Sequence, residues 1–192
     1  MDRVDRHAPS ARDRLLAAAS RLFYEDGIRA VGVNTIATQA QVTKATLYAH
    51  FGSKDGLITE HLRARDQRWR RDLQRFLTGH LHPASQLGAI FAAYRAWTVA
   101  DDFRGCGFVN AAAELPDPTH PARAVIDAHK HAIRVRLEDL ATVADCPDPS
   151  DTAEQWFLLL EGGMLMTTLR RDPAPLDRAH DMATRLLPTQ HT

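Results

Sequence analysis

The sequence predicts an all-α protein of about nine helices. Three observations support this fold class: apolar residues recur every three or four positions, no alternating run is bounded by hairpin turns, and prolines are clustered. Proline is unfavourable inside helices, so its clusters mark helix boundaries. Prolines occupy positions 9, 83, 116, 118, 121, 147, 149, 173, 175 and 188. The segments between them, including the long stretch before residue 83, are therefore expected to be helical.

The first helix is expected to begin after Ser10. Serine is a good N-cap, and Asp13 in the first turn favours the positive end of the helix dipole. Gly27 follows the last residue of the apolar stripe and is expected to end the helix.

Two short helices are expected next, at about 33–40 and 44–51. Thr43 is placed to cap the second of them, Gly52 breaks it, and Ser53 caps a longer helix that runs from residue 54 into an arginine-rich segment. The chain is therefore expected to divide into a three-helix N-terminal domain over 1–53 and a larger helical domain over 54–192.

The remaining helices follow the proline clusters. Asp151 with Glu154 three residues later resembles a capping box at the start of the penultimate helix. The expected helices lie near 84–100, 107–115, 121–144, 151–171 and 175–187.

Helix 151–171 is apolar around most of its circumference, so it must be covered on more than one side. It is interpreted either as the central helix of a monomeric bundle or as part of a four-helix seam between two subunits. The candidate interface residues on the last two helices are Trp156, Leu160, Gly163, Met164, Leu176, Met182 and Leu186.

Composition is that of a globular protein, with 44% hydrophobic and 25% charged residues among 192. No apolar run approaches the roughly 20 residues that span a bilayer, and the first ten residues lack the apolar core of a signal peptide, so a cytoplasmic location is expected. Cys106 and Cys146 are too few and too far apart for a disulfide framework or a paired metal motif.

The net charge of zero conceals an uneven distribution. Residues 1–75 contain 14 basic and 9 acidic side chains, so the first part of the chain is basic and the rest equally acidic. This asymmetry favours an anion-binding N-terminal part, although chance clustering on solvated helix faces would produce the same count.

Residues 35–51, TIATQAQVTKATLYAHF, fit a helix-turn-helix pattern. The outward face of the second helix would present side chains that suit DNA: Lys44 and Thr46 for base edges or phosphates, and Ala45 for a thymine methyl group. Tyr48 and His50 can each donate a hydrogen bond to phosphate, and Lys54 lies at the next helix N-terminus, where an anion is favoured.

These residues carry a specific resemblance. Residues 11–60, with FYEDGI, VNTIATQAQV and TKATLYAHFGSKDGL, resemble the DNA-binding domain of the TetR family of bacterial repressors. The resemblance implies the following DNA-contacting residues: Asn34, Thr35, Thr43, Lys44, Ala45, Thr46, Tyr48, His50 and Lys54. Two positions depart from the family pattern. Gly32 replaces a capping threonine, for which Asn34 is expected to compensate, and Gln41 replaces a turn glycine, so a left-handed backbone is expected there.

The resemblance also implies that residues 1–53 form the helix-turn-helix DNA-binding domain and that residues 54–192 form a helical effector-binding and dimerisation domain. The protein would be a ligand-responsive transcriptional regulator, a repressor that binds a pseudo-palindromic operator as a homodimer and is released by a small-molecule effector. The segment FRGCGFVNAAAELPDPTHPA (103–122) is similar to one found in a subset of these regulators. The candidate pocket residues are Tyr94, Trp97, Phe103, Cys106, Phe108, Asn110, His129 and Met164, and ordinary core packing is the alternative for each.

Two other classes of protein are weighed against this one. An enzyme could use Cys106 as a nucleophile with His129 or His131 as base, but no catalytic signature is present. A helical protein that binds only small molecules or proteins would not need the Thr46-to-Lys54 spacing. Neither a cofactor nor a metal site is expected, since the histidines lack a ligand spacing.

Overall fold

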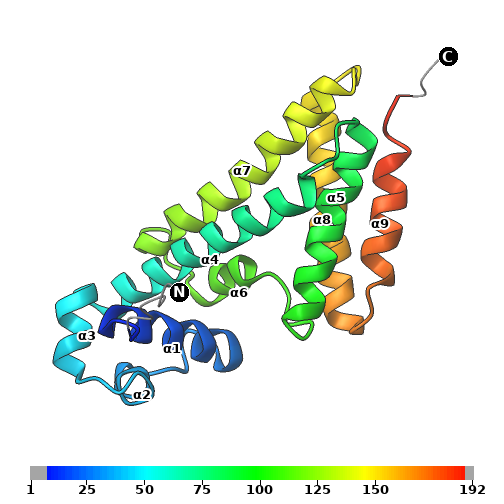
Figure 1. Ribbon diagram of the computed structural model, residues 1–192. Coiled ribbons are helices and arrows are strands. Elements are labelled where there is room, and N and C mark those ends of the chain that lie inside the picture. Colours follow the sequence, from blue (N-terminus) through cyan, green and yellow to red (C-terminus); the bar gives the residue numbers. More distant parts are fainter. Residues whose placement is uncertain (1–7, 189–192) are drawn as a thin grey trace, which may run out of the picture. The chain divides into compact units, whose positions relative to one another are not determined.

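The computed structural model describes residues 8–188, and this part of the chain forms nine α-helices without a strand (Figure 1). The predicted all-α fold of about nine helices is confirmed. The helices are α1 (Ala11–Asp26), α2 (Val33–Gln39), α3 (Lys44–Phe51), α4 (Lys54–Leu77), α5 (Pro83–Ala100), α6 (Gly107–Glu114), α7 (Pro121–Val143), α8 (Pro149–Arg170) and α9 (Ala174–Thr184).

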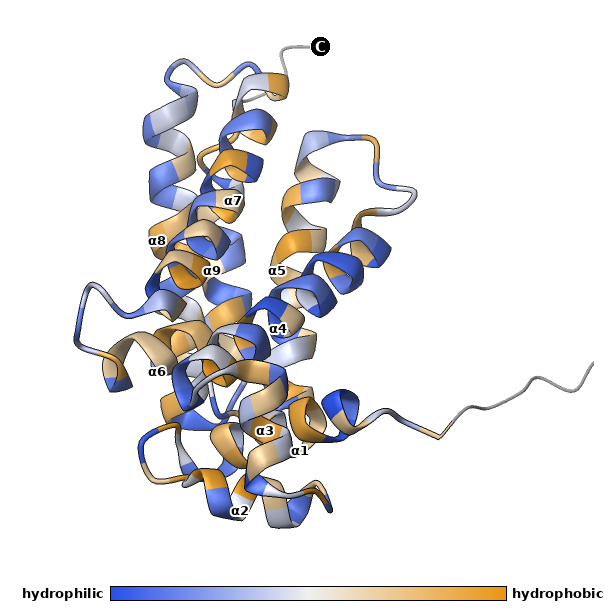
Figure 2. Ribbon diagram, turned by 90° about the vertical axis from the view of Figure 1, so that its left-hand side faces the viewer, coloured by the Kyte–Doolittle hydropathy of each residue, from blue (hydrophilic) through white to orange (hydrophobic). Residues whose placement is uncertain are grey.

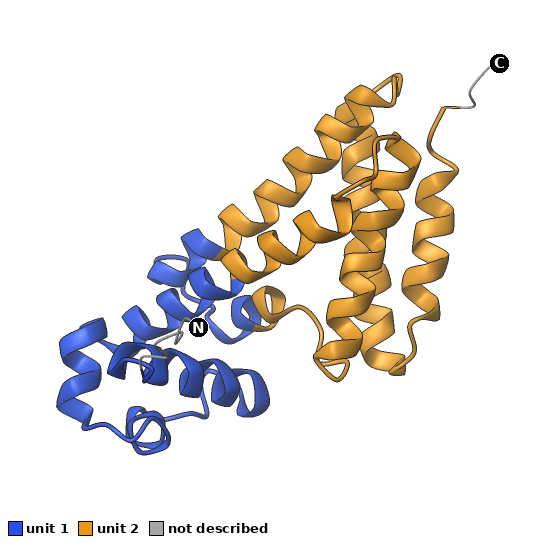
Figure 3. Ribbon diagram, viewed as in Figure 1, with its two compact units in different colours: residues 1–65, 111–125 blue, residues 66–110, 126–192 orange. Residues whose placement is uncertain are grey.

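The chain forms two compact units (Figure 3). The first contains the residues up to 65 together with 111–125, and the second contains 66–110 and the residues from 126 onward. The predicted division after residue 53 did not include the start of α4 or the segment 111–125 in the N-terminal unit. We call the first unit the head and the second the body.

Helix ends in the head follow from short polar residues and glycine. Ser10 accepts a hydrogen bond from the Asp13 amide at 3.1 Å, and the Asp13 carboxylate accepts one from the Ser10 amide, which completes a capping box. Gly27 and Gly52, at φ of 92° and 71°, end α1 and α3 in backbone conformations that side chains disfavour. These three boundaries agree with the sequence prediction.

The core of the head is made by one side chain or more from each of its helices. Leu15 of α1, Ile36 of α2, Leu47 of α3 and Leu57 of α4 are fully buried. The Arg14 guanidinium also donates a hydrogen bond to the Ala40 carbonyl at 3.0 Å, which joins α1 to the end of α2. The two short helices are thus fixed by packing and by a side-chain bond to the backbone.

The body is a helical bundle whose core surrounds Trp156. Apolar residues follow α5 and α8, whereas α4 is mostly hydrophilic (Figure 2). Trp156 is fully buried and its indole donates to the Ala183 carbonyl at 2.8 Å. The Thr167 hydroxyl accepts a hydrogen bond from the Leu176 amide at 3.2 Å, so α8 and α9 are joined at two points.

The start of α8 differs from the sequence prediction. Asp148 is the N-cap and accepts from the Asp151 amide at 3.0 Å, with Pro149 in the first turn. Glu154 instead forms an ion pair with Arg134 of α7 at 2.8 Å. The expected Asp151–Glu154 capping box is therefore wrong, because proline is well suited to the first helical turn and starts the helix two residues earlier.

None of the helices in residues 8–188 is long and apolar enough to cross a membrane.

Gly163 sets the distance between α8 and α9. A Cβ atom at this position would lie 2.8 Å from the Ala179 Cβ, and Gly163→Ala is therefore expected to destabilise the fold by about 1–3 kcal/mol through overpacking. Ala179→Gly alone should cost about 1 kcal/mol of helix propensity. The double variant should cost less than the sum, because the second change removes the clash. Urea unfolding at one fixed protein concentration measures all three, and strict additivity would contradict the close approach.

Candidate DNA-binding surface and effector pocket

The turn between α2 and α3 has a defined geometry. Gln41 adopts φ 54°, the left-handed backbone that the family resemblance predicted, and its amide donates to the Thr38 carbonyl at 3.0 Å. The next amide, of Val42, donates to the Ala37 carbonyl at 3.0 Å. The left-handed residue lets the chain reverse direction within a few residues, so that α3 starts immediately after the turn.

The N-terminus of α3 is closed by its own threonines. The Thr43 hydroxyl accepts a hydrogen bond from the Thr46 amide at 3.1 Å and lies 2.8 Å from the Thr46 hydroxyl. Thr43 is thus the N-cap, as predicted. Thr46 is half-buried, so a contact from it to DNA would use the exposed part of its side chain.

The outer side of α3 and the start of α2 present exposed polar side chains. Tyr48 is 40% exposed, and the Lys44 ammonium lies 5.8 Å from the centre of its ring. Residues 27–54 contain three basic side chains and neither Asp nor Glu. This surface therefore suits an anionic partner. The exposed predicted residues are Asn34, Thr35, Thr43, Lys44, Ala45, Tyr48 and His50.

Lys54 is the predicted phosphate ligand with a different environment. Its ammonium donates a hydrogen bond to the Ile28 carbonyl at 2.7 Å and is half-buried. Burial lowers the pKa of Lys54, while Asp55 and Glu114 act in the opposite direction. Lys54 thus ties the start of α4 to the turn after α1, a structural role that the sequence pattern did not indicate.

The start of α2 has no side-chain cap. Gly32 occupies the N-cap position and nothing lies within 4 Å of where its Cβ would be. Asn34 forms no capping hydrogen bond in its place, so the expected compensation is wrong. The geometry explains this, because Asn34 follows the N-cap by two residues and lies in the first helical turn, beyond the capping position.

Residues 111–125 supply contacts of the head that sequence reasoning missed. The Glu114 carboxylate accepts a hydrogen bond from the Arg29 amide at 2.9 Å and lies against Gly27. His120 lies 3.3 Å from the Asp55 carboxylate at the start of α4. The only sequence signal is Gly27, where the absence of a side chain leaves room for Glu114.

In the body, four residues from four segments form a polar cluster. Lys130 of α7 donates to both carboxylate oxygens of Glu161 in α8, at 2.6 and 2.7 Å, and to the Cys106 sulfur at 3.5 Å. The Tyr94 hydroxyl is buried without a hydrogen-bond partner. Burial, followed by the negative charge of Glu161 and by Cys106, raises the Tyr94 pKa well above its usual value. Tyr94 therefore remains a neutral donor that is available to a bound molecule.

Lys130 and Glu161 were not predicted as pocket residues. Their side chains are about one-fifth exposed, and a partly buried pair of opposite charges is stable only when both members are paired and hydrogen-bonded. The sequence held one signal, because Glu161 interrupts the apolar segment 156–169.

A second group of predicted pocket residues surrounds His129. Its ring is stacked on Phe108 with centroids 3.6 Å apart and meets Trp69 edge-on at 5.0 Å. The Nδ1 atom lies 2.7 Å from the Asp66 carboxylate, whose other oxygen accepts from Arg70 at 2.7 Å. Burial lowers the His129 pKa to about 4 although the hydrogen bond to Asp66 acts in the opposite direction. His129 is thus a neutral, hydrogen-bonded histidine of the core.

The other predicted pocket residues are in different surroundings. Trp97 lies 3.4 Å from the Asp72 carboxylate, Phe103 lies beneath the Arg171 guanidinium, and the exposed Asn110 donates to the Arg104 carbonyl at 2.9 Å. Met164 is buried in the core of the body. The structure therefore brings together Tyr94 with Cys106 and Phe108 with His129.

The enzyme interpretation finds no support in this geometry. The hydrogen-bond partner of Cys106 is Lys130, whereas His129 is engaged by Asp66 and His131 is exposed. Within residues 8–188, no three His, Cys, Asp or Glu side chains are grouped so that they could hold a metal ion.

A helix-turn-helix head joined to a helical body defines a class of transcriptional regulators. The family model described as bacterial regulatory proteins, tetR family, matches residues 15–60, and that of the tetracyclin repressor-like C-terminal domain matches residues 83–183. The chain belongs to the TetR family of transcriptional regulators.

Individual relatives agree with this assignment. A TetR-family transcriptional regulator from Streptomyces coelicolor has a solved structure with a TM-score of 0.85 and 31% identity, covering 92% of this chain and 95% of that one. The regulatory protein TetR from Rhodobacter sphaeroides has a TM-score of 0.78 and 26% identity, covering 93% and 99%. The HTH-type transcriptional regulator YjdC of Escherichia coli is 28% identical over 92% of this chain and 93% of its own length. These relatives are regulators rather than enzymes.

The neutral state of His129 makes stability depend on pH. Its pKa of about 4 in the folded protein is below the ordinary 6.5, so the unfolded chain binds a proton more readily. The contribution of neutral His129 is present above pH 6.5 and is lost as pH falls from 6.5 through 4, amounting to about 3 kcal/mol. Urea unfolding between pH 7 and 4 should show this loss, and His129→Gln should reduce it.

His131 provides the matched control because it is an exposed histidine two residues further along the same helix. An equal reduction in His131→Gln, or an NMR titration of the His129 ring near pH 6.5, would contradict the neutral assignment.

Proposed function

We propose that this chain is a ligand-responsive repressor that binds a pseudo-palindromic DNA operator as a homodimer and is released by a small-molecule effector. The observation that carries the proposal is the exposed, acid-free surface of α2 and α3, because a short helix with outward-facing donors fits the major groove. Lys44, Tyr48 and His50 would be the main contacts, with Asn34, Thr35, Thr43, Ala45 and Thr46 at their sides.

The role proposed for Lys54 differs from that of the other contacts. Its ammonium is held by the Ile28 carbonyl, so it supports the head directly and reaches phosphate only if that bond opens or is shared. Lys44 makes no such bond, and its interaction is with the ring of Tyr48. A variant of Lys54 therefore tests folding and binding together, whereas variants of Lys44 and Tyr48 test binding.

A second copy of the chain would cover the outer face of α8. Leu158, Leu165 and Leu169 are 61%, 56% and 68% exposed, and they follow one side of the helix at spacings of seven and four residues. Exposed apolar stripes of this kind mark interfaces. Met166, Met182 and Leu186 extend the exposed apolar surface from α8 to α9, and two such helix pairs would form a four-helix seam.

This surface shares only Met182 and Leu186 with the set of interface residues predicted from the sequence. The structure buries five of the predicted interface residues inside the chain's own core, and only Met182 and Leu186 are exposed. The five buried residues are Trp156, Leu160, Gly163, Met164 and Leu176. They would support the interface from beneath and would not contact a second subunit.

Effector binding is proposed for the interior of the body. Tyr94 offers an unpaired donor, and the Lys130–Glu161 pair and Cys106 place further polar atoms in the same region. An effector need only favour the state of low DNA affinity by a few kcal/mol to release the operator. Selection of bound DNA from a random pool, followed by footprinting, tests the central claim, since two half-sites about 34–36 Å apart or a multiple are expected.

Variants of α3 should weaken operator binding without affecting the fold. Lys44→Ala removes an exposed charge, so the affinity should fall about tenfold on any DNA and the salt dependence should become shallower by about one unit of slope. Tyr48→Phe and His50→Ala should act in the same direction. Fluorescence anisotropy at several salt concentrations measures each variant, and thermal unfolding should remain unchanged.

Two comparisons make this test specific. Lys54→Ala should lower both the melting temperature and the affinity, because it removes the bond to Ile28. Arg71→Ala, an exposed arginine of α4 in the body, is the charge-matched control and should bind like the parent. Unchanged binding in a combined Lys44→Ala, Tyr48→Phe and His50→Ala variant would show that the DNA surface lies elsewhere.

A charge in the outer stripe of α8 should abolish the dimer. Leu158→Glu would bury carboxylates in the seam, so light scattering should give the mass of a monomer and operator affinity should fall with it. Val143→Glu is the control, since Val143 is equally exposed at 65% but lies at the end of α7. If both variants keep the mass of the parent, this face is not the interface.

A further inference from the structure

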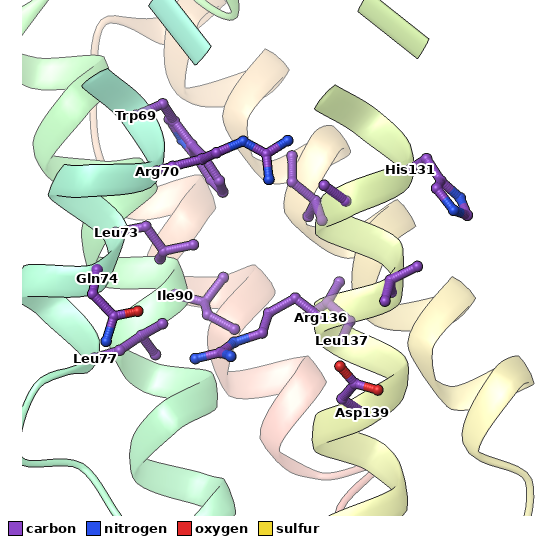
Figure 4. Close-up of a pocket in the computed structure, with 13 residues that line it drawn as sticks. Trp69, Arg70, Leu73, Gln74, Leu77, Ile90, His131, Arg136, Leu137 and Asp139 are labelled. Atoms are coloured by element: carbon purple, nitrogen blue, oxygen red, sulfur yellow. The ribbon is translucent and has the colours of Figure 1, made fainter. Parts of the chain in front are cut away.

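The body contains a cavity that none of the predicted effector residues lines. It has a volume of about 510 Å³ and is formed by α4, α5 and α7 (Figure 4). Its floor consists of apolar side chains that are at most 8% exposed: Trp69, Leu73, Leu77, Ile90, Ile133 and Leu137. A volume of this size is typical of small-molecule sites, which lie at about 300–1,000 Å³.

The rim of the cavity is charged. Arg70 extends from α4 toward α7, and Arg136 extends from α7 toward α4, so that two guanidinium groups reach across the opening from opposite sides (Figure 4). His131 points away from the cavity in the same view, and Gln74 lies on the α4 side. Asp139 is the one carboxylate among the lining residues.

The two arginines differ in their partners. Arg70 is held by the Asp66 carboxylate at 2.7 Å. Arg136 is half-buried and forms neither an ion pair nor a hydrogen bond with any residue in the described part of the chain. An arginine above an apolar floor, without a partner among the described residues, can bind a carboxylate with two parallel hydrogen bonds.

We propose that this cavity binds an amphipathic organic anion, an apolar chain or ring system that carries one carboxylate. The apolar part would cover the floor around Trp69 and Leu137, and the carboxylate would pair with Arg136, with Arg70 adding to the positive field. A neutral analogue would leave Arg136 unpaired, and a cationic analogue would be repelled by the two guanidinium groups. Both should therefore bind more weakly than the carboxylate. The inference adds a ligand class to the proposed effector response. Binding at the cavity does not depend on the proposed function, and only the effect of that binding on the operator complex rests on it.

Direct binding is the first test. Full-length protein is titrated with octanoate, decanoate and dodecanoate below their micellar concentrations, using calorimetry and tryptophan fluorescence, because Trp69 lines the cavity. Affinity should rise roughly fourfold for each added methylene until the floor is covered. Decanol and decyltrimethylammonium should bind at least about tenfold more weakly than decanoate.

Variants locate the site. Arg136→Gln should weaken decanoate binding by about tenfold or more, whereas Arg134→Gln should leave it unchanged, since Arg134 is exposed on the same helix and pairs with Glu154. Ala132→Phe fills the cavity from its wall and should abolish binding of every chain length. Circular dichroism and thermal unfolding verify that each variant folds like the parent.

Several results would overturn the proposal. These are equal affinity for decanol or the quaternary ammonium, undiminished binding in both Arg136→Gln and Ala132→Phe, or loss of binding in Lys130→Met with Arg136→Gln unaffected. The last result would place the anion at the Lys130–Glu161 cluster instead.

The operator assay separates this inference from the proposed function. Decanoate that binds through Arg136 and releases operator DNA supports both. Binding through Arg136 that leaves the operator complex intact supports the cavity and overturns its role as the effector site. Failure of the protein to select any DNA contradicts the repressor assignment, while Arg136-dependent binding would still support the cavity.

Discussion

The proposed DNA-binding surface depends on the burial of Leu47 beneath it. Helices of seven and eight residues are not stable alone in water, so α2 and α3 exist only because their inner side chains are packed. Leu47 and Ile36 are fully inaccessible to solvent, and Arg14 adds a hydrogen bond from α1 to the end of α2. The exposed side chains of Lys44, Tyr48 and His50 are consequently not needed for this packing, so they can contact a partner without loss of the core.

Charged and polar groups inside the protein are stabilised by ion pairs and hydrogen bonds. In the body, Lys130 pairs with Glu161. The Asp66 carboxylate is shared between His129 and Arg70, and because burial disfavours a charged imidazole and Arg70 supplies the positive charge beside Asp66, His129 remains neutral. In the head, Lys54 is satisfied by a backbone carbonyl. Because buried charges without partners are costly, two exceptions in residues 8–188 are informative: Tyr94 and Arg136 each have a donor without a partner in the body.

The sequence predicted local features well and distant contacts poorly. The cap at Ser10 and the break at Gly52 follow from single-residue chemistry, the left-handed Gln41 follows from the family resemblance, and all three were found. The bond from Lys54 to Ile28 and the pair of Lys130 with Glu161 join residues 26 and 31 positions apart. Such contacts depend on which helix faces pack against each other, and the periodicity of apolar residues does not predict that pairing. The burial of the predicted interface residues of α8 in the chain's own core could not be predicted for the same reason, since a helix that is apolar all round does not reveal which side faces its own chain.

A single helix, α8, takes part in three surfaces of the body. Trp156 packs in the core, Glu161 holds Lys130, and Leu165 belongs to the exposed stripe, all within ten residues of a rigid rod. A substitution that reshapes one of these faces also shifts or rotates the other two. If the proposed effector response holds, a change of ligand specificity made on α8 would have to preserve the outer geometry of that helix. Engineering of effector specificity would therefore begin with the cavity-lining residues of α4 and α7.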